Sequence, residues 1–267
     1  MTAVVKREPC PELPDLRLND MPLNEKQKLE NDLRLAARIQ GARLNRLQAC
    51  FEGWHSHHVY QPAGLVGGDY SDVFDVGDRL FFLVGDVSGK GFGACLMMSH
   101  LHATICALAH RGLALPEMIG AANTTFSRNF SPGQFATLIV GHAEPDGAVE
   151  FVSAGHLPFL HLCKAGTRSQ GATAVPIGLF PDARFPSEHL KLDPGQSLLI
   201  CTDGVTEARN PLDHEYGFDR LISVAERHYA ARPPNLLEEC LKDLRSFTGE
   251  EKYADDVTLL AIRRSPC

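Results

Sequence analysis

The chain lacks the features that mark nucleic-acid-binding or extracellular proteins. Its 26 lysines and arginines are outnumbered by 33 aspartates and glutamates, so the clustered basic surface that nucleic acids require is not expected. None of its eight cysteines belongs to a CxxC pair, and Cys95, Cys106 and Cys201 lie within apolar segments, as reduced thiols of a protein core do. We therefore expect a cytoplasmic protein that binds no nucleic acid.

Long hydrophobic runs and the signatures of two familiar phosphate chemistries are also missing. No apolar stretch approaches the about 18 residues that span a membrane, and the charged, proline-containing start does not resemble a signal peptide, so no membrane contact is expected. The GxxxxGK[ST] spacing of a Walker loop is absent, as is the Cys-x5-Arg sequence of cysteine phosphatases. With 44% hydrophobic and 22% charged residues, the chain can nevertheless bury a substantial core.

Aspartates stand at the predicted ends of strands that are far apart in the sequence. The segments that carry them are Gly67-Gly68-Asp69-Tyr70, Gly85-Asp86-Val87-Ser88-Gly89-Lys90-Gly91, Thr202-Asp203-Gly204 and Asp255-Asp256-Val257-Thr258. Asp86 and Asp203 follow apolar runs, whereas Asp255 precedes one, so an antiparallel last strand would bring all the carboxylates to one edge of a sheet. A single Asp-Gly after a strand is usually a turn. Four such segments together instead predict a cation site, and carboxylate oxygens suit Mg2+ or Mn2+, which indicates a metal-dependent hydrolase.

Further short stretches give this pattern a recognisable order. They are Val66-Gly67-Gly68-Asp69-Tyr70-Ser71-Asp72, Phe135-Ala136-Thr137-Leu138, Ser153-Ala154-Gly155-His156-Leu157-Pro158, Pro176-Ile177-Gly178-Leu179 and Thr202-Asp203-Gly204-Val205-Thr206-Glu207-Ala208. Together with the Asp86 and Asp255 segments they cover about residues 24 to 264. In this order they resemble the metal-dependent (PPM, protein phosphatase 2C-like) serine/threonine phosphatases, in the bacterial SpoIIE/RsbU branch. The resemblance implies an α+β fold, a four-layer αββα sandwich of two mainly antiparallel sheets flanked by helices.

The resemblance also implies a catalytic centre that holds two Mn2+ or Mg2+ ions. Carried over by motif, the ligands are Asp69, Asp86, the Val87 carbonyl, Asp203 and Asp255. Asp256 stands where related eukaryotic enzymes often have asparagine, which favours a supporting role, although Asp255 and Asp256 can exchange roles. A water that bridges the two ions would attack the phosphate monoester, because paired cations lower the pKa of water and screen the phosphoryl oxygens.

Two positions depart from the pattern of the eukaryotic relatives. Ser88 stands where those enzymes have a histidine, a candidate general acid. No phosphate-binding arginine lies close before Asp69, the closest being Arg46. Protonation of the leaving group and capture of the phosphate are therefore unassigned, with Lys90 and water as the candidates.

Three regions are expected along the chain: a flexible tail of residues 1–22, a linker or signalling helix within 23–48, and a phosphatase domain of residues 49–264. Strands are predicted at 57–62, 65–76, 79–87, 134–142, 148–154, 157–163, 189–193, 197–202 and 256–263. Helices are predicted at about 93–110, 116–128, 217–229 and 234–247. The first of these helices follows the Asp86 loop, and the resemblance implies a helical switch there, while a plain core helix fits its pattern equally well.

The N-terminal helix and the histidines each admit two interpretations. A stripe of Leu29, Leu33, Ala36 or Ala37, Gln40, Leu44 and Leu47 runs along residues 24–47. This helix either packs on the domain or serves signalling, as a homodimer contact or a site for a regulatory protein. His55, His57 and His58 are expected to be strand or loop residues rather than a metal site, because no partners with ligand spacing accompany them. His156 is expected to fix a turn.

By resemblance, the substrate is phosphoserine or phosphothreonine on a regulatory protein, plausibly a STAS-domain anti-anti-sigma factor in a bacterial partner-switching pathway. Two alternatives stay open. One is a catalytically inactive binding module that kept the phosphatase fold, which the filled acidic positions disfavour. The other is a hydrolase for small phosphorylated molecules.

Overall fold

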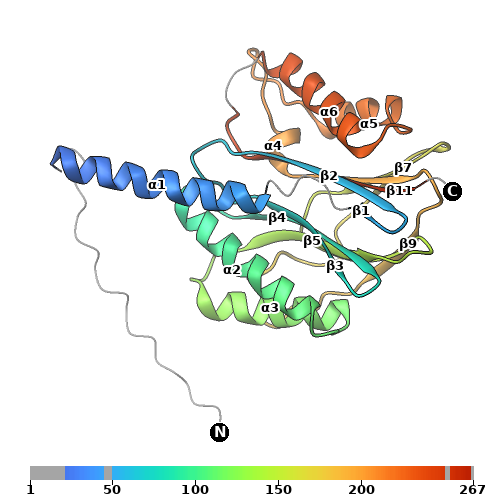
Figure 1. The fold of residues 1–267 in the computed structure, drawn as a ribbon, viewed down its shortest axis with the longest axis horizontal. Coiled ribbons are helices and arrows are strands. Elements are labelled where there is room, and N and C mark those ends of the chain that lie inside the picture. The colour runs from blue at the N-terminus through green and yellow to red at the C-terminus, as the bar shows by residue number, and fades with distance from the viewer. Residues whose placement is uncertain (1–21, 45–49, 250–252, 266–267) are drawn as a thin grey trace, which may run out of the picture.

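Two antiparallel β-sheets lie face to face and are covered on both outer sides by helices (Figure 1). The computed structural model describes residues 22–44, 50–249 and 253–265. The first sheet contains, in spatial order, β1 (Cys50–Phe51), β2 (Trp54–Gln61), β11 (Val257–Arg264), β10 (Ser197–Cys201), β7 (Phe159–Cys163) and β8 (Gly166–Gln170). The second contains β3 (Tyr70–Val76), β4 (Arg79–Val87), β5 (Ala136–Ala143), β6 (Ala148–Ala154) and β9 (Glu188–Lys191). The expected α+β sandwich of four layers is thus confirmed.

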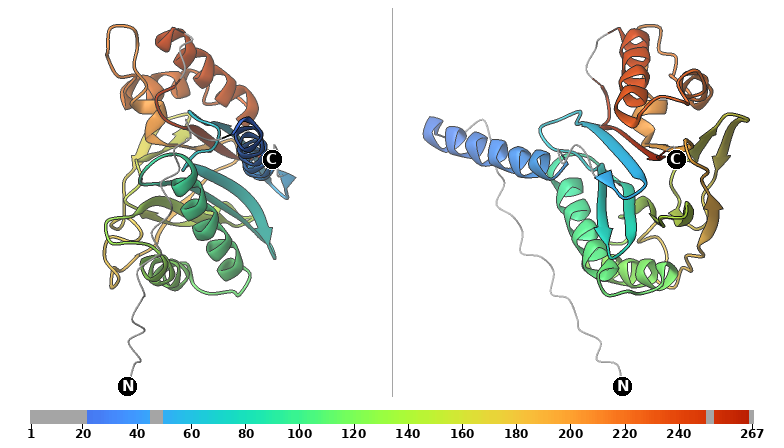
Figure 2. Two further views of the ribbon diagram at one scale, coloured as in Figure 1. Left: turned by 90° about the vertical axis from the view of Figure 1, so that its left-hand side faces the viewer. Right: turned by 45° about the vertical axis from the view of Figure 1, so that its right-hand side comes forward.

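Helices from two parts of the chain form the outer layers. α2 (Gly91–Ala109) and α3 (Leu115–Asn129) cover the second sheet, and α5 (Phe218–Arg227) and α6 (Pro233–Thr248) cover the first. The remaining helices are α1 (Leu23–Leu44), at the N-terminal side, and the single turn α4 (Asp203–Thr206), directly after β10. Figure 2 shows the same layers from two further sides.

Each sheet is buried on both of its faces, as β4 shows. Phe81 and Leu83 pack against α2 and α3, while Leu80, Phe82 and Val84 point between the two sheets. All five side chains are at most 6% exposed. Burying a side chain of this size stabilises the fold by roughly 1.5–3 kcal/mol. Burial on both faces also explains why these strands read as continuous apolar runs rather than as alternating patterns.

Several elements differ from expectation, including the two-residue strand β1, which was not predicted. The strand predicted from residue 65 begins only at Tyr70, because residues 65–69 form a loop whose backbone meets other segments closely at Gly67 and Gly68. β8 was not predicted, since it is a largely exposed edge strand without an apolar face. α4 is a single turn, too short to produce a helical period.

The helix α2 corrects the expectation that no segment is apolar enough to span a membrane. This 19-residue helix contains an 18-residue window with a mean hydropathy of 1.5, which meets the length and composition of a membrane helix. Seven of its residues are buried, however, and Met98, Leu101 and Ile105 belong to the core between α2, α3 and the second sheet. The apolar character of α2 is therefore that of a core helix.

The helix α1 projects from the body of the molecule and meets it at its C-terminal end (Figure 2). Residues of the predicted stripe, such as Leu29, Leu33 and Gln40, are partly buried, whereas Leu35 and Ile39 are 47% and 58% exposed. Leu47 and the predicted tail lie outside the described residues, apart from residue 22. The helix thus presents a more covered side and an open side.

Candidate active site

The predicted carboxylates gather at one end of the sandwich, where strands of both sheets terminate. Asp69 directly precedes β3 and Asp86 is the second-last residue of β4, both in the second sheet. Asp203 begins α4 after β10, and Asp255 and Asp256 precede β11, in the first sheet, where β10 and β11 are antiparallel as expected. The prediction that they meet at one edge of a single sheet is therefore wrong: the site lies between two sheets.

Asp69 is the most deeply placed carboxylate of the site. It is 2% exposed, and its Oδ2 accepts hydrogen bonds from the hydroxyls of Thr202 and Thr258, both at 2.6 Å. Thr202 and Thr258 belong to strand ends of the other sheet, so the two bonds join the sheets at the site. They also fix the orientation of Asp69, which leaves its Oδ1 for another partner.

Asp256 is occupied by backbone amides. Its Oδ1 accepts a hydrogen bond from the Ala63 amide at 2.9 Å, and its Oδ2 accepts one from the Asp69 amide at 3.4 Å. A Cβ at Gly67 would overlap this carboxylate, so only glycine allows the loop to pass there. Asp256 thereby holds the loop that carries Asp69, which agrees with a supporting role.

The same loop is held from its other side by α1. The side-chain amide of Gln40 donates to the Gly67 carbonyl at 2.8 Å, and the Gly67 amide donates back to Gln40 Oε1 at 3.2 Å. The side-chain amide of Gln40 thus both donates to and accepts from one backbone residue, as paired residues of neighbouring β-strands do. The C-terminal part of α1 is thus hydrogen-bonded directly to the loop that carries Asp69 and that Asp256 also holds.

Asp255 lies at the open rim of the site and pairs with Lys90. The Lys90 Nζ is 2.7 Å from Asp255 Oδ2 and donates to the Ala254 carbonyl at 2.9 Å. Both side chains are about half exposed, so the pair is screened by solvent. Lys90 therefore links the Asp86 loop to the entry of β11.

Burial and mutual repulsion raise the pKa values of the deeper carboxylates. Burial, followed by the charges of Asp203 and Asp255, raises the pKa of Asp86 to about 7. Burial and the neighbouring Asp86 likewise raise the pKa of Asp69, although the two threonine hydroxyls oppose this. The pKa of Asp203 is also raised, by burial and by Asp255. These carboxylates are together more negative than their surroundings can neutralise.

The chemistry of this set fits divalent cations. Several carboxylate oxygens face one lysine, and a hard cation would offset the negative charge that burial and repulsion make unfavourable. Among the described residues, no three of these carboxylates place their oxygens within 4.8 Å of one another.

A cleft of about 240 Å³ opens beside Asp86 and Asp203, and His156 and Glu207 also line it. His156 Nδ1 accepts a hydrogen bond from the Thr137 hydroxyl at 2.8 Å, and its Nε2 lies 3.1 Å from the Cys201 carbonyl. Burial lowers the pKa of His156 to about 4, so the ring is neutral and Nε2 donates to the carbonyl. His156 therefore bridges the sheets under the cleft, a structural role close to the one expected.

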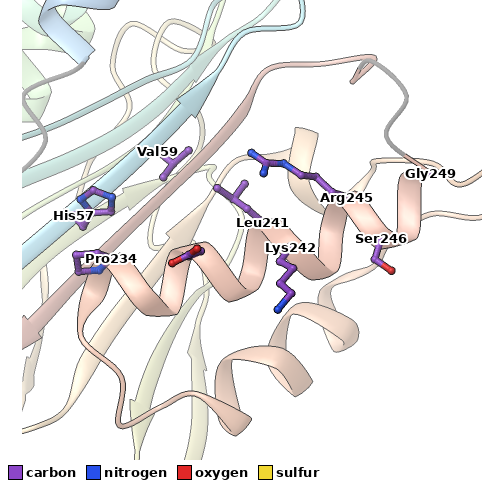
Figure 3. Close-up of a pocket in the computed structure, with 9 residues that line it drawn as sticks. His57, Val59, Pro234, Leu241, Lys242, Arg245, Ser246 and Gly249 are labelled. Atoms are coloured by element: carbon purple, nitrogen blue, oxygen red, sulfur yellow. The ribbon is translucent and has the colours of Figure 1, made fainter.

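Other predicted positions lie apart from the carboxylates. His55 and His57 lie on one face of β2 and the buried His58 on the other, where its Nδ1 is 3.1 Å from the Ser71 hydroxyl. These histidines do not converge, as expected. His57, with Lys242 and Arg245 of α6, instead lines a hollow of about 970 Å³ between β2 and α6, to which no carboxylate of the site contributes (Figure 3).

Several contributors were not assigned from the sequence. Thr202, Thr258 and Glu207 lie within the sequence motifs, and their closeness in sequence to the aspartates is the feature that could have identified them as part of the site. Gln40 gave none beyond its place in the helical stripe. Ser88, the position that departs from the eukaryotic pattern, accepts a hydrogen bond from the Phe135 amide at 3.0 Å and thus anchors the loop.

The chain is similar to several characterised bacterial proteins. Residues 76–265 match the family model described as Stage II sporulation protein E (SpoIIE). Protein IcfG of Synechocystis is 27% identical over an alignment of 242 residues that covers 79% of this chain and 38% of IcfG. Phosphoserine phosphatase RsbU of Bacillus subtilis is 24% identical, over 89% of this chain and 71% of RsbU. The chain thus spans well under half of IcfG.

Solved structures agree. The RsbU and RsbW domains of Rv1364c from Mycobacterium tuberculosis superpose with a TM-score of 0.71 at 31% identity, covering 81% of this chain and 62% of that one. The SiaA-PP2C domain of Pseudomonas aeruginosa superposes with a TM-score of 0.77 at 21% identity, covering 90% and 98%. A family match over most of the chain, on a PP2C-like sandwich with its acidic segments in place, shows that this protein belongs to the SpoIIE family.

Proposed function

We propose that this protein hydrolyses phosphoserine or phosphothreonine on a regulatory protein, with two divalent cations, Mn2+ or Mg2+, as cofactors. The observation that carries the proposal is the group of aspartates between the two sheets, whose pKa values are raised by burial and mutual repulsion. The names of the relatives support it, since RsbU and RsbP of Bacillus subtilis are phosphoserine phosphatases.

The proposed ligands are Asp69, Asp86, the Val87 carbonyl, Asp203 and Asp255. Asp256 then supports the loop of Asp69 through its two backbone hydrogen bonds. Bound there, the cations would make water nucleophilic at neutral pH and neutralise the phosphoryl charge.

The chain's own side chains would then orient and protect these ligands. Thr202 and Thr258 hold Asp69 in one rotamer, so that its remaining oxygen faces the centre. His156, neutral and buried, keeps the two sheets at a fixed separation under the cleft. Lys90 is the candidate for contacting the substrate phosphate, and to do so it would leave its ion pair with Asp255.

The proposed substrate and setting follow the resemblance to the RsbU branch. A phosphorylated STAS-domain anti-anti-sigma factor, in a cytoplasmic partner-switching pathway, is the substrate we favour. Residues 49–264 would form the phosphatase domain, and the exposed side of the helix in 23–48 would receive a regulatory protein or a second copy of the chain.

The test is metal-dependent hydrolysis of p-nitrophenyl phosphate and of a phosphoserine peptide, with Asp203→Asn and the exposed Asp182→Asn as a matched pair. Turnover should require Mn2+ or Mg2+ and fall by about 100-fold or more in Asp203→Asn only. Calorimetric Mn2+ titration separates the alternatives. Metal binding without turnover of either substrate would indicate an inactive binding module. Fast turnover of small esters alone would indicate a metabolite hydrolase. Turnover that does not depend on metal would indicate that the active site lies elsewhere.

A further inference from the structure

A second group of metal-ligating side chains lies on the outer face of the second sheet, under α2. Asp72 is on β3, and His102 and Cys106 are one turn apart on α2. One ligand atom from each of the three lies within 4.8 Å of the other two, and among the described residues no other group of three or more His, Cys, Asp or Glu side chains does this. Asp72 points toward α2, on the same strand face as Tyr70 and away from the space between the sheets.

The three side chains converge on a single ring nitrogen. His102 Nε2 lies 2.9 Å from Asp72 Oδ2 and 3.0 Å from Cys106 Sγ. If Nε2 carries a proton and donates it to Asp72, it has no lone pair for the thiol. If Nε2 instead accepts a hydrogen bond from the Cys106 thiol, it carries no proton and cannot donate to the Asp72 carboxylate. A single Nε2 proton therefore serves the two contacts unequally, since it donates strongly to the carboxylate and only weakly to the sulfur.

A cation would satisfy both contacts at once. Burial would raise the pKa of Asp72, but hydrogen bonds from His102, from the Val73 amide and from Tyr70 outweigh it and lower that pKa, so the carboxylate is anionic. His102 Nδ1 is buried without a hydrogen-bond partner among the described residues, so it is free to carry the ring proton, at the cost of a buried N–H without an acceptor that metal binding has to exceed. The cluster thus offers a carboxylate, an imidazole and a thiol to one point.

We propose that Asp72, His102 and Cys106 form a site for Zn2+ or a similar transition-metal ion, distinct from the carboxylate centre. Thiolate and imidazole ligands select Zn2+ over Mg2+, which prefers oxygen. Tetrahedral bonds of about 2.0–2.3 Å place neighbouring ligand atoms about 3.4–3.6 Å apart, so the side chains need to open by about half an ångström. Binding releases the Cys106 thiol proton, shifts the imidazole proton to Nδ1, and leaves a fourth position for water.

The ion would join α2 to β3 near the middle of the helix. Because α2 follows the Asp86 loop, the bond would limit how far the helix can move relative to the strand after Asp69. The inference does not depend on the proposed phosphatase activity, since it rests on different residues and predicts sulfur ligation, which the carboxylate centre cannot provide.

The test is a Co2+ titration of the full chain, because thiolate-bound Co2+ shows a charge-transfer band in the near ultraviolet that oxygen-bound Co2+ does not. We expect this band at one equivalent in the wild type, in Cys163→Ser and in Asp203→Asn, with bleaching on addition of Zn2+. Cys106→Ser should lose the band, and His102→Gln should weaken binding by about tenfold or more. Far-ultraviolet circular dichroism checks that both variants are folded. No band in the wild type, or a band that survives in folded Cys106→Ser, would overturn the proposal.

Discussion

Replacing Asp86 by asparagine should stabilise the metal-free protein at neutral pH and remove its response to metal. Asp86 lies near Asp203 and Asp255, and burial together with these charges raises its pKa from 3.8 to about 7. In the absence of metal, ionised Asp86 is therefore repelled in the folded state more than in the unfolded chain. The asparagine amide has nearly the same shape and carries no charge, so it relieves this repulsion.

The size and sign of the effect follow from the pKa. A difference of about three units corresponds to about 4 kcal/mol, and partial contact with solvent reduces this to about 2–4 kcal/mol. Because the folded state binds the proton more tightly, its contribution is fully present below about pH 4 and is lost as the pH rises through about 7. The metal-free wild type should therefore lose stability across this pH window. Asp86→Asn should lose less stability, because Asp86 no longer titrates, but some loss should remain, because Asp69 and Asp203 still do.

Urea denaturation in the presence of a chelator, repeated from about pH 4 to about pH 8, measures this directly. Repeating the series with Mn2+ at about 100 times its Kd should stabilise the wild type by about 2.7 kcal/mol and the variant far less. The exposed Asp182→Asn serves as the control for a lost carboxylate. Wild-type stability that rises with pH, or an Asp86→Asn protein less stable than wild type in chelator at pH 8, would refute the reasoning.

Two further substitutions probe the loop and the rim. Gly67→Ala would displace the Asp256 carboxylate from its two amide donors and should lower the free energy of unfolding by about 2–4 kcal/mol. The control Gly64→Ala, where an added Cβ meets only ordinary contacts, should change the free energy of unfolding by about 0.5 kcal/mol or less. Equal urea midpoints for the two variants would contradict this prediction. Lys90→Gln removes the cation that competes at Asp255 and should tighten Mn2+ binding by up to about fivefold in calorimetry, with weaker binding counting against competition.

The sequence predicted the ends of β4 and β10 well because these strands are buried on both faces. Such strands are continuous apolar runs, and an aspartate beside a run marks where it ends, as at Asp86 and Asp203. The run does not reveal to which sheet a strand belongs, so the site was expected at one sheet edge and lies between two sheets.

Contacts between distant segments were beyond such reasoning. The i, i+4 spacing of His102 and Cys106 places them on one helix face, but nothing in the sequence shows that Asp72 faces them. The pairing of Gln40 with Gly67 depends likewise on where α1 ends on the domain. Short exposed elements such as β8 carry too little hydrophobic pattern to be found.

The two hydroxyls that hold Asp69 have a consequence for how the protein folds. They come from residues 133 and 189 positions further along the chain. Closing loops of this length costs conformational entropy before the contacts between the sheets can form. The two sheets are therefore expected to dock late in folding. A nascent or partly folded chain then lacks the assembled group of carboxylates, so the proposed cations would bind only after the whole sandwich has formed. Metal capture and the final folding step should therefore share one rate.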